Sequence, residues 1–127
     1  MAMDKQKRLV TLLSKRTIAG LLNWKETINP DTFQLYLANK TVRIRKTRSR
    51  EEPDDEFQVE LLNSEGQVVD AFTDDELINS PDDPDGEREV HWHNTLRALF
   101  DMVRRTALGS EKILSEVIKE LEGDSPV

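Results

Sequence analysis

The chain of 127 residues contains no cysteine. A disulfide framework, a thiolate metal site and a cysteine nucleophile are therefore excluded. Aromatic residues are also scarce, at 6% of the chain, and hydrophobic residues reach only 36%. The apolar residues are nevertheless clustered and periodic, which predicts a modest folded core in place of disorder. A chain of this length is typical of one core, so we expect residues 1–127 to form a single domain.

Long apolar runs are missing from the sequence. No segment approaches the roughly 20 residues that a helix needs to cross a bilayer. The first eight residues are rich in charge and do not have the apolar centre of a signal peptide. We therefore expect a cytoplasmic protein without a membrane partner.

The charges are unevenly distributed along the chain, whose net charge is −7. Residues 1–50 contain 12 Lys and Arg against 3 Asp and Glu, whereas residues 51–127 contain 6 against 22. Two interpretations remain open. The two halves attract each other across the folded surface and keep the protein soluble, or one of them forms a charged binding surface.

The first half predicts one helix followed by a β-meander. Apolar residues with helical spacing predict a helix over about residues 4–22, although Gly20 weakens its last turn. Period-two alternation predicts four antiparallel strands, at residues 32–38, 41–47, 56–62 and 67–73. We place the first hairpin turn at Asn39–Lys40 and the last at 63–66. The alternation of the fourth strand is ambiguous, and we expect Val69 and Ala71 to face the helices.

The second half predicts an acidic loop and two helices. Residues 74–87 are rich in carboxylates and proline, with room for a short helical turn at 74–79. Amphipathic patterns then predict helices over about residues 88–108 and 110–122, separated at Gly109. The fold class is therefore α+β: an N-terminal helix, a four-stranded antiparallel β-meander, and two C-terminal helices packed on one sheet face.

One cluster of basic residues is a candidate interaction surface. It occupies the hairpin at residues 40–50 and has a single aromatic neighbour on the solvent side. The candidate residues are Tyr36, Lys40, Arg43, Arg45, Lys46, Arg48 and Arg50. Such a surface could bind phosphates, with Tyr36 stacking on a base. The acidic residues at 51–56 follow directly and could screen it, so salt bridging to the neighbouring acidic loops or docking of an acidic partner is the stronger interpretation.

Metal binding and catalysis have little support in the sequence. Aligning Gly86 with the glycine of an EF-hand loop places Pro81 and Trp92 at ligand positions, so that motif is excluded and only weak divalent-ion binding stays open. His91 and His93 diverge on a helix and would share a face only in an extended segment. No phosphate loop, nucleophile elbow or zinc-protease motif occurs. We expect no cofactor, no metal site and no catalytic residue.

The combined pattern resembles a family of small uncharacterised bacterial proteins. The resemblance rests on Trp24, on the hairpin 33–37 with 42–44, on the turn 63–70, and on the segment 103–109. It implies an α–meander–α arrangement and a bacterial cytoplasmic origin. It implies no activity.

These observations predict a non-enzymatic protein–protein interaction or adaptor module, with homodimerisation as one form. The segregated charge and the edge strands, which can recruit a partner strand, motivate this hypothesis. A nucleic-acid-binding protein using the basic residues 40–50 is the first alternative. An enzyme with an unrecognised site is the second.

Overall fold

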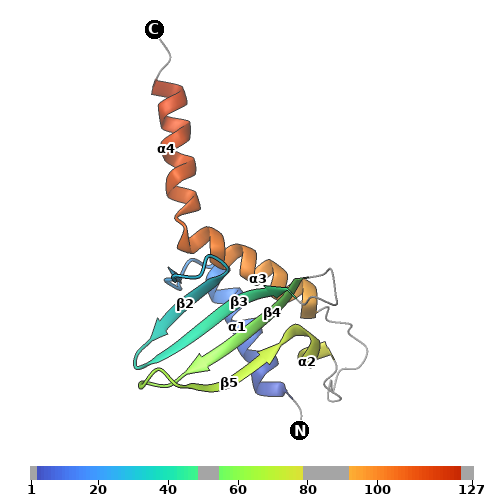
Figure 1. Cartoon of the computed structure of the whole chain (residues 1–127). Helices are drawn as coiled ribbons and strands as arrows, with labels where there is room; N and C mark the ends of the chain where they lie inside the picture. The colour runs from blue at the N-terminus through green and yellow to red at the C-terminus, as the bar shows by residue number, and fades with distance from the viewer. Residues whose placement is uncertain (1–2, 49–54, 79–91, 124–127) are drawn as a thin grey trace.

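The computed structural model describes residues 3–48, 55–78 and 92–123. Its elements are α1 (Asp4–Ile18), β1 (Lys25–Glu26), β2 (Thr32–Leu37), β3 (Lys40–Arg48), β4 (Asp55–Leu62), β5 (Val68–Thr73), α2 (Asp74–Ile78), α3 (Trp92–Ala107) and α4 (Ser110–Gly123). The strands form one antiparallel sheet in the order β1-β2-β3-β4-β5 (Figure 1). The predicted α+β class and the meander are thereby confirmed.

The described part of the sheet has five strands instead of the predicted four. The additional strand is β1, in which Lys25 lies opposite Gln34 and Glu26 opposite Phe33. A strand of two residues cannot display a period-two alternation, so the sequence carries no signal for it. It extends the sheet beyond β2 and forms one edge.

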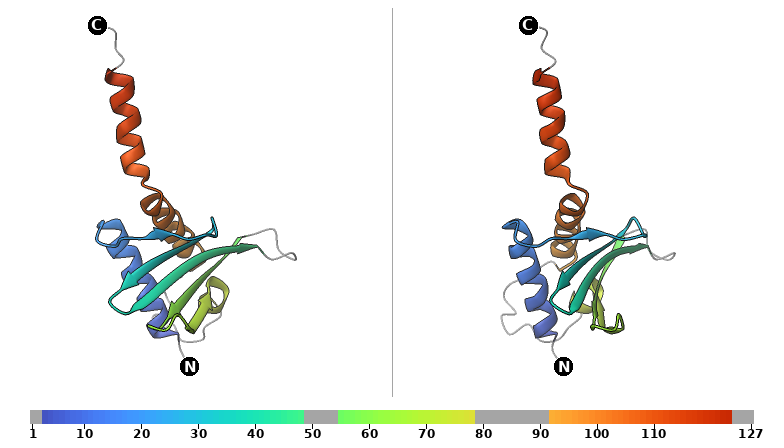
Figure 2. Two further views of the ribbon diagram at one scale, coloured as in Figure 1. Left: turned by 60° about the vertical axis from the view of Figure 1, so that its left-hand side comes forward. Right: turned by 90° about the vertical axis from the view of Figure 1, so that its left-hand side faces the viewer.

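Helices α1 and α3 cover the same face of the sheet (Figure 2). Between them and the strands lies the core, in which the ring of Phe100 from α3 packs 5.6 Å from Phe33 and 5.5 Å from Phe57. Leu77 of α2 joins the same core next to β4 and β5. No described helix covers the opposite, outer face of the sheet (Figure 1).

The facing of β5 is the reverse of the prediction. Phe72 is fully buried on the helix side, whereas Val69 and Ala71 are exposed. Asp70 also faces the helices, where its carboxylate accepts a hydrogen bond of 3.2 Å from Gln6 of α1. An aromatic ring gains more from burial than two small side chains, and Gln6 makes the inward carboxylate tolerable. A β-bulge at Leu61–Leu62 further shifts the register at the start of the strand.

Two chain reversals differ from the predicted positions. The turn between β2 and β3 consists of Ala38 and Asn39, because Leu37 pairs with Lys40, and Ala38 adopts the positive φ of +51°. α1 ends at Ile18 instead of near residue 22, because Gly20 has a φ of +73°. The chain then returns to Trp24, whose Nε1 donates a 3.1 Å hydrogen bond to Thr17 Oγ1.

The predicted acidic loop at 74–87 begins as a helix. α2 occupies Asp74–Ile78, within the span where a short helical turn was expected, and residues 79–87 lie outside the described residues. The helix expected over 88–108 is present as α3 from Trp92 to Ala107, and 88–91 also lie outside the described range.

The last helix does not pack on the sheet as predicted. Of the two predicted C-terminal helices, α3 packs on the sheet, whereas α4 has no buried residue and extends away from the domain (Figures 1 and 2). Gly109 separates the two helices and has a φ of +70°, which an L-residue adopts at a cost. The positive φ ends α3 and starts α4 in a new direction.

Candidate functional site

The predicted basic residues are divided between the two faces of the sheet. Arg43 and Arg45 project from the outer face, because they alternate with the buried Val42 and Ile44. Lys46 continues the alternation of Val42 and Ile44 and so faces the helices. Its ammonium group lies 5.7 Å from the centroid of the Phe100 ring. The strand therefore does not present one continuous basic surface.

The remaining predicted residues are also separated. Lys40 is the first residue of β3, directly after the β2–β3 turn, where it donates a 3.3 Å hydrogen bond to Asn39. Arg48 ends β3, at the far end of that strand, with its backbone opposite Asp55. Arg50 lies outside the described residues. Among the candidate residues whose side chains the structure describes, Tyr36, Arg43 and Arg45 lie together.

A polar network links these three residues on the outer face. Arg43 donates a 3.3 Å hydrogen bond to Gln34, and Gln34 donates a 2.9 Å hydrogen bond to the Tyr36 hydroxyl. The buried Glu60 of β4 lies 3.6 Å from the Arg43 guanidinium and 3.8 Å from that of Arg45. Its carboxylate offsets one of the two positive charges. The prediction named the neighbouring acidic loops as the partners, whereas the ion pairs seen here are with a residue of β4.

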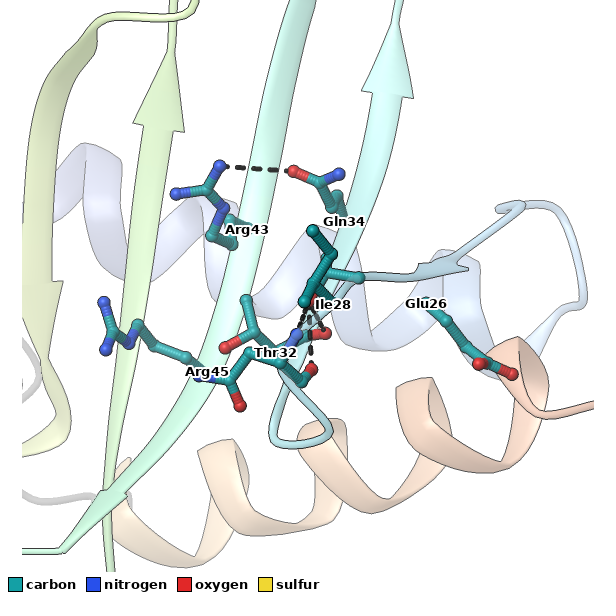
Figure 3. A pocket seen from close by; sticks show the side chains of 8 residues that line it. Glu26, Ile28, Thr32, Gln34, Arg43 and Arg45 are labelled. Atoms are coloured by element: carbon teal, nitrogen blue, oxygen red, sulfur yellow. Dashed lines mark hydrogen bonds between the residues drawn. The ribbon is translucent and has the colours of Figure 1, made fainter.

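A broad hollow of about 720 Å³ lies beside this network, next to the loop between β1 and β2. Figure 3 shows Arg43 and Arg45 on its β4 side and Ile28 from the loop near its centre, while Glu26 points away from both arginines. Ile28 is fully exposed in this position. Arg43 and Arg45 line the hollow but are both already paired with Glu60, and Glu26 also lines it, so the hollow has no net positive charge to offer a ligand.

Asp74 and His93 form a pair that the sequence pattern does not reveal. The Asp74 carboxylate is buried, accepts a 3.2 Å hydrogen bond from the Phe57 backbone N–H, and contacts His93 Nδ1 with its other oxygen. The pair joins β4, α2 and α3 at one point. The two residues are 19 positions apart, and no local spacing connects them.

The described residues contain no group of three or more His, Cys, Asp or Glu side chains that could hold a metal ion. The Asp74–His93 pair links β4, α2 and α3 through the contacts described above. His91 and residues 81–91 of the segment compared with an EF-hand loop lie outside the described residues, whereas Trp92 begins α3.

The largest unexplained feature is the apolar stripe of α4. Every residue from Glu111 to Gly123 is exposed, although apolar side chains recur at helical spacing. The apolar stripe consists of Ile113, Leu114, Val117, Ile118 and Leu121, with exposed fractions from 45% to 73%. The same residues carry the sequence signal for a helix, but the pattern cannot say what covers them.

Acidic residues border the apolar stripe on both sides. At 3.6 residues per turn, Glu111 and Glu122 follow one edge of the stripe and Glu120 follows the other. Lys112 and Lys119 lie on the opposite side of the helix. A partner helix that lies along the stripe would therefore meet negative charge on each flank.

A second apolar area surrounds the point where α4 begins. Ile18, Leu21 and Leu108 are exposed there, and a groove of about 520 Å³ separates the end of α1 from the start of α4. Arg105 and Gly109 are among the residues that line it. We call this area the base of α4.

Comparison of the chain with protein-family models, with curated proteins and with solved structures finds no match. The resemblance to small bacterial proteins stays a prediction. Within the described ranges, none of the helices combines the length and the apolar character that a membrane crossing requires.

Proposed function

We propose that this protein is a non-enzymatic protein–protein interaction module whose binding element is α4. The observation that supports the proposal is the exposed apolar stripe on a helix that makes no buried contact with its own domain. An isolated helix of 14 residues is marginal in water, since helices in proteins are stabilised mostly by burying an apolar face. Exposed apolar patches of this kind mark interaction surfaces.

The partner that fits this stripe is an amphipathic helix. Leu114, Val117 and Leu121 follow the alternating three- and four-residue spacing of a helix–helix seam. Ile113 and Ile118 widen the seam on either side, as in a helix that lies against another helix or in a groove. A flat or extended partner would not match a curved row of this spacing.

Energies set a limit on what the stripe can do alone. Covering a half-exposed aliphatic side chain gives about 1 kcal/mol, so five give about 5 kcal/mol. Association itself costs at least about 4 kcal/mol in lost translational and rotational freedom. The stripe by itself supports weak binding, and a stable complex also requires contacts outside α4.

The sheet edges offer a poorer route to a partner strand. β1 provides only two residues for pairing, and β5 begins at a bulge. Short and bulged edges are devices that disfavour strand addition. The exposed stripe of α4 is therefore a better binding element than either described edge of the sheet.

Nucleic-acid binding through residues 40–50 is the alternative, and it has less support. Lys46 lies on the helix side, and Glu60 accompanies Arg43 and Arg45 on the outer face. A labelled single-stranded oligonucleotide at low salt tests it. Binding that is lost in Arg43→Ala and retained in Lys46→Ala would favour this alternative and place the site on the outer face.

The proposed function predicts which positions of α4 contact a partner in the cell. A photo-reactive amino acid introduced at Val117, within the stripe, is expected to cross-link to a defined polypeptide, since the partner covers this position. The same group at Lys119, on the opposite side of α4, is the matched control. Mass spectrometry of the product identifies the polypeptide.

Equal labelling from Val117 and Lys119 would contradict the proposed function. It would also be contradicted if neither position gave a discrete product. A discrete product of any composition from Val117 alone supports it. Because both side chains are exposed, neither replacement is expected to disturb the fold.

A further inference from the structure

The exposed side of α1 is basic and complements α4. Residues 5, 8, 12, 15 and 16 follow helical spacing on one face of α1, and all five are exposed. Leu12 lies at the centre of this face, surrounded by Lys5, Arg8, Lys15 and Arg16. We call it the basic face of α1. On this face one apolar side chain is bordered by cations, whereas α4 presents an apolar stripe bordered by carboxylates.

The two helices are also matched in length and direction. α1 has 15 residues and α4 has 14. Both views of Figure 2, and Figure 1, show the two helices running in nearly the same direction, with α4 beyond the C-terminal end of α1. The base of α4, with its groove, lies between them.

In a pair of chains, this arrangement lets each α4 lie against the α1 of the other copy. A two-fold axis across the base, perpendicular to the two helices, would place α1 of a second copy beside α4 of the first. The same operation places α4 of the second copy beside α1 of the first. Each pair of helices is then antiparallel, and the two bases meet at the axis. A contact made twice in this way is the usual geometry of homodimers.

We propose that the protein binds a second copy of itself through this reciprocal contact, with the apolar stripe of α4 against the basic face of α1. This inference rests on the proposed function, since it names the partner of the same α4 surface. Pairing α4 with α4 is disfavoured, because it would bring the acidic borders of the two stripes together. Contact with both α1 and the base supplies the area beyond the stripe that stable association needs.

The proposed two-fold axis sets which residues lie at the same level along the paired helices. Leu12 lies six residues before the end of α1 at Ile18, and Val117 lies seven residues after the start of α4 at Ser110. At 1.5 Å per residue, these positions are about 9 and about 10 Å from the base. Leu12 of one copy and Val117 of the other are therefore at the same level.

Cysteine cross-linking tests this register, because the native chain has no cysteine. Leu12→Cys and Val117→Cys chains, distinguished by a cleavable tag on one of them, are mixed as full-length proteins and oxidised mildly. We expect a mixed disulfide between the two variants as the main product. Each variant alone should stay largely unlinked, since two copies of the same position are about 20 Å apart across the axis. Sedimentation of the unmodified chain should give twice the mass of the monomer.

Several outcomes would overturn the inference. A strong disulfide in Val117→Cys alone would show that α4 pairs with α4. A monomer without any mixed disulfide would remove the second copy as the partner. If Val117 still cross-links photochemically to a different polypeptide, the proposed function stands and only this inference fails. If that cross-link is also missing, both fail.

Discussion

Asp74 is the most deeply buried ionisable residue in the described part of the chain. Its two carboxylate oxygens have separate tasks: one accepts the Phe57 N–H and the other contacts His93. A buried polar group is tolerated when its hydrogen bonds are made, and it then fixes the elements that supply the partners. Here those elements are β4, α2 and α3.

Removing this carboxylate should destabilise the fold. We expect Asp74→Ala to lower the free energy of unfolding by about 2–3 kcal/mol, because the Phe57 N–H and the His93 ring lose a buried partner. Urea denaturation of the full chain measures the change. The exposed Asp75 is the matched control, and its replacement by Ala should change stability by less than about 0.5 kcal/mol. Equal effects at both positions would contradict the structural role.

The neighbours Arg45 and Lys46 show how one step along a strand changes the role of a cation. Arg45 lies on the outer face beside Glu60, and Lys46 lies over the Phe100 ring at the border of the core. The sequence places six basic residues within 11 positions, which favours a single patch. The strand period of two divides them.

At the scale of elements, Gly109 determines where α4 points. A Cβ at this position would meet no atom within 4 Å, so the requirement for glycine comes from its positive φ and not from crowding. A helix that continued through position 109 would carry the stripe of α4 along another axis. The direction of α4 beyond the base therefore depends on one backbone conformation.

Gly109→Ala should accordingly affect both stability and assembly. The left-handed backbone costs alanine about 1 kcal/mol. We expect that loss in urea denaturation, together with weaker self-association in sedimentation experiments if α4 is redirected to relieve the strain. Gly123→Ala is the matched control, since Gly123 ends α4 without a positive φ and has open space around it. Unchanged association in Gly109→Ala would show that the direction of α4 is not needed for the contact.

At the scale of the whole molecule, the uneven charge of the chain acquires a specific interpretation. The basic face of α1 belongs to the half with 12 Lys and Arg, and α4 belongs to the half with 22 Asp and Glu. Because α4 projects from its own domain, these helices do not neutralise each other within one chain (Figure 2). In the proposed dimer they do so between chains.

Charge reversal tests this interpretation. Glu120 and Arg8 each lie ten residues from the base, so they are expected to face each other between copies. Glu120→Lys and Arg8→Glu should each raise the dissociation constant of the dimer about three- to tenfold, since a like-charge contact replaces an opposite one. Combining the two substitutions should restore most of the affinity.

The control and the salt response complete this experiment. Lys119→Glu changes a charge on the opposite side of α4 and should leave the dissociation constant nearly unchanged. Raising the salt concentration from about 0.1 M to about 1 M shortens the screening length from about 10 Å to about 3 Å, so the native dimer should weaken. Additive losses in the double variant would contradict the pairing of Glu120 with Arg8.

Much of the fold follows from local patterns. Helical spacing predicts α1, α3 and α4, and alternation predicts β2, β3 and β4, because these periods are properties of a single segment. β1 and the facing of β5 do not follow, since a two-residue strand has no period and β5 offers two apolar faces. The face that carries Phe72 turns inward because this side chain fits into the core, which the pattern of β5 alone does not show.

The candidate site divides in the same way. The sequence by itself determined that residues 110–122 form an amphipathic helix with acidic borders, and that cations concentrate in residues 1–50. Only the tertiary structure decided that the stripe of α4 stays uncovered, that Glu60 lies beside Arg43 and Arg45, and that Asp74 meets His93. A pattern states which side of an element is apolar. What covers that side depends on chain segments far away in sequence, and for α4 no described segment of the same chain does so.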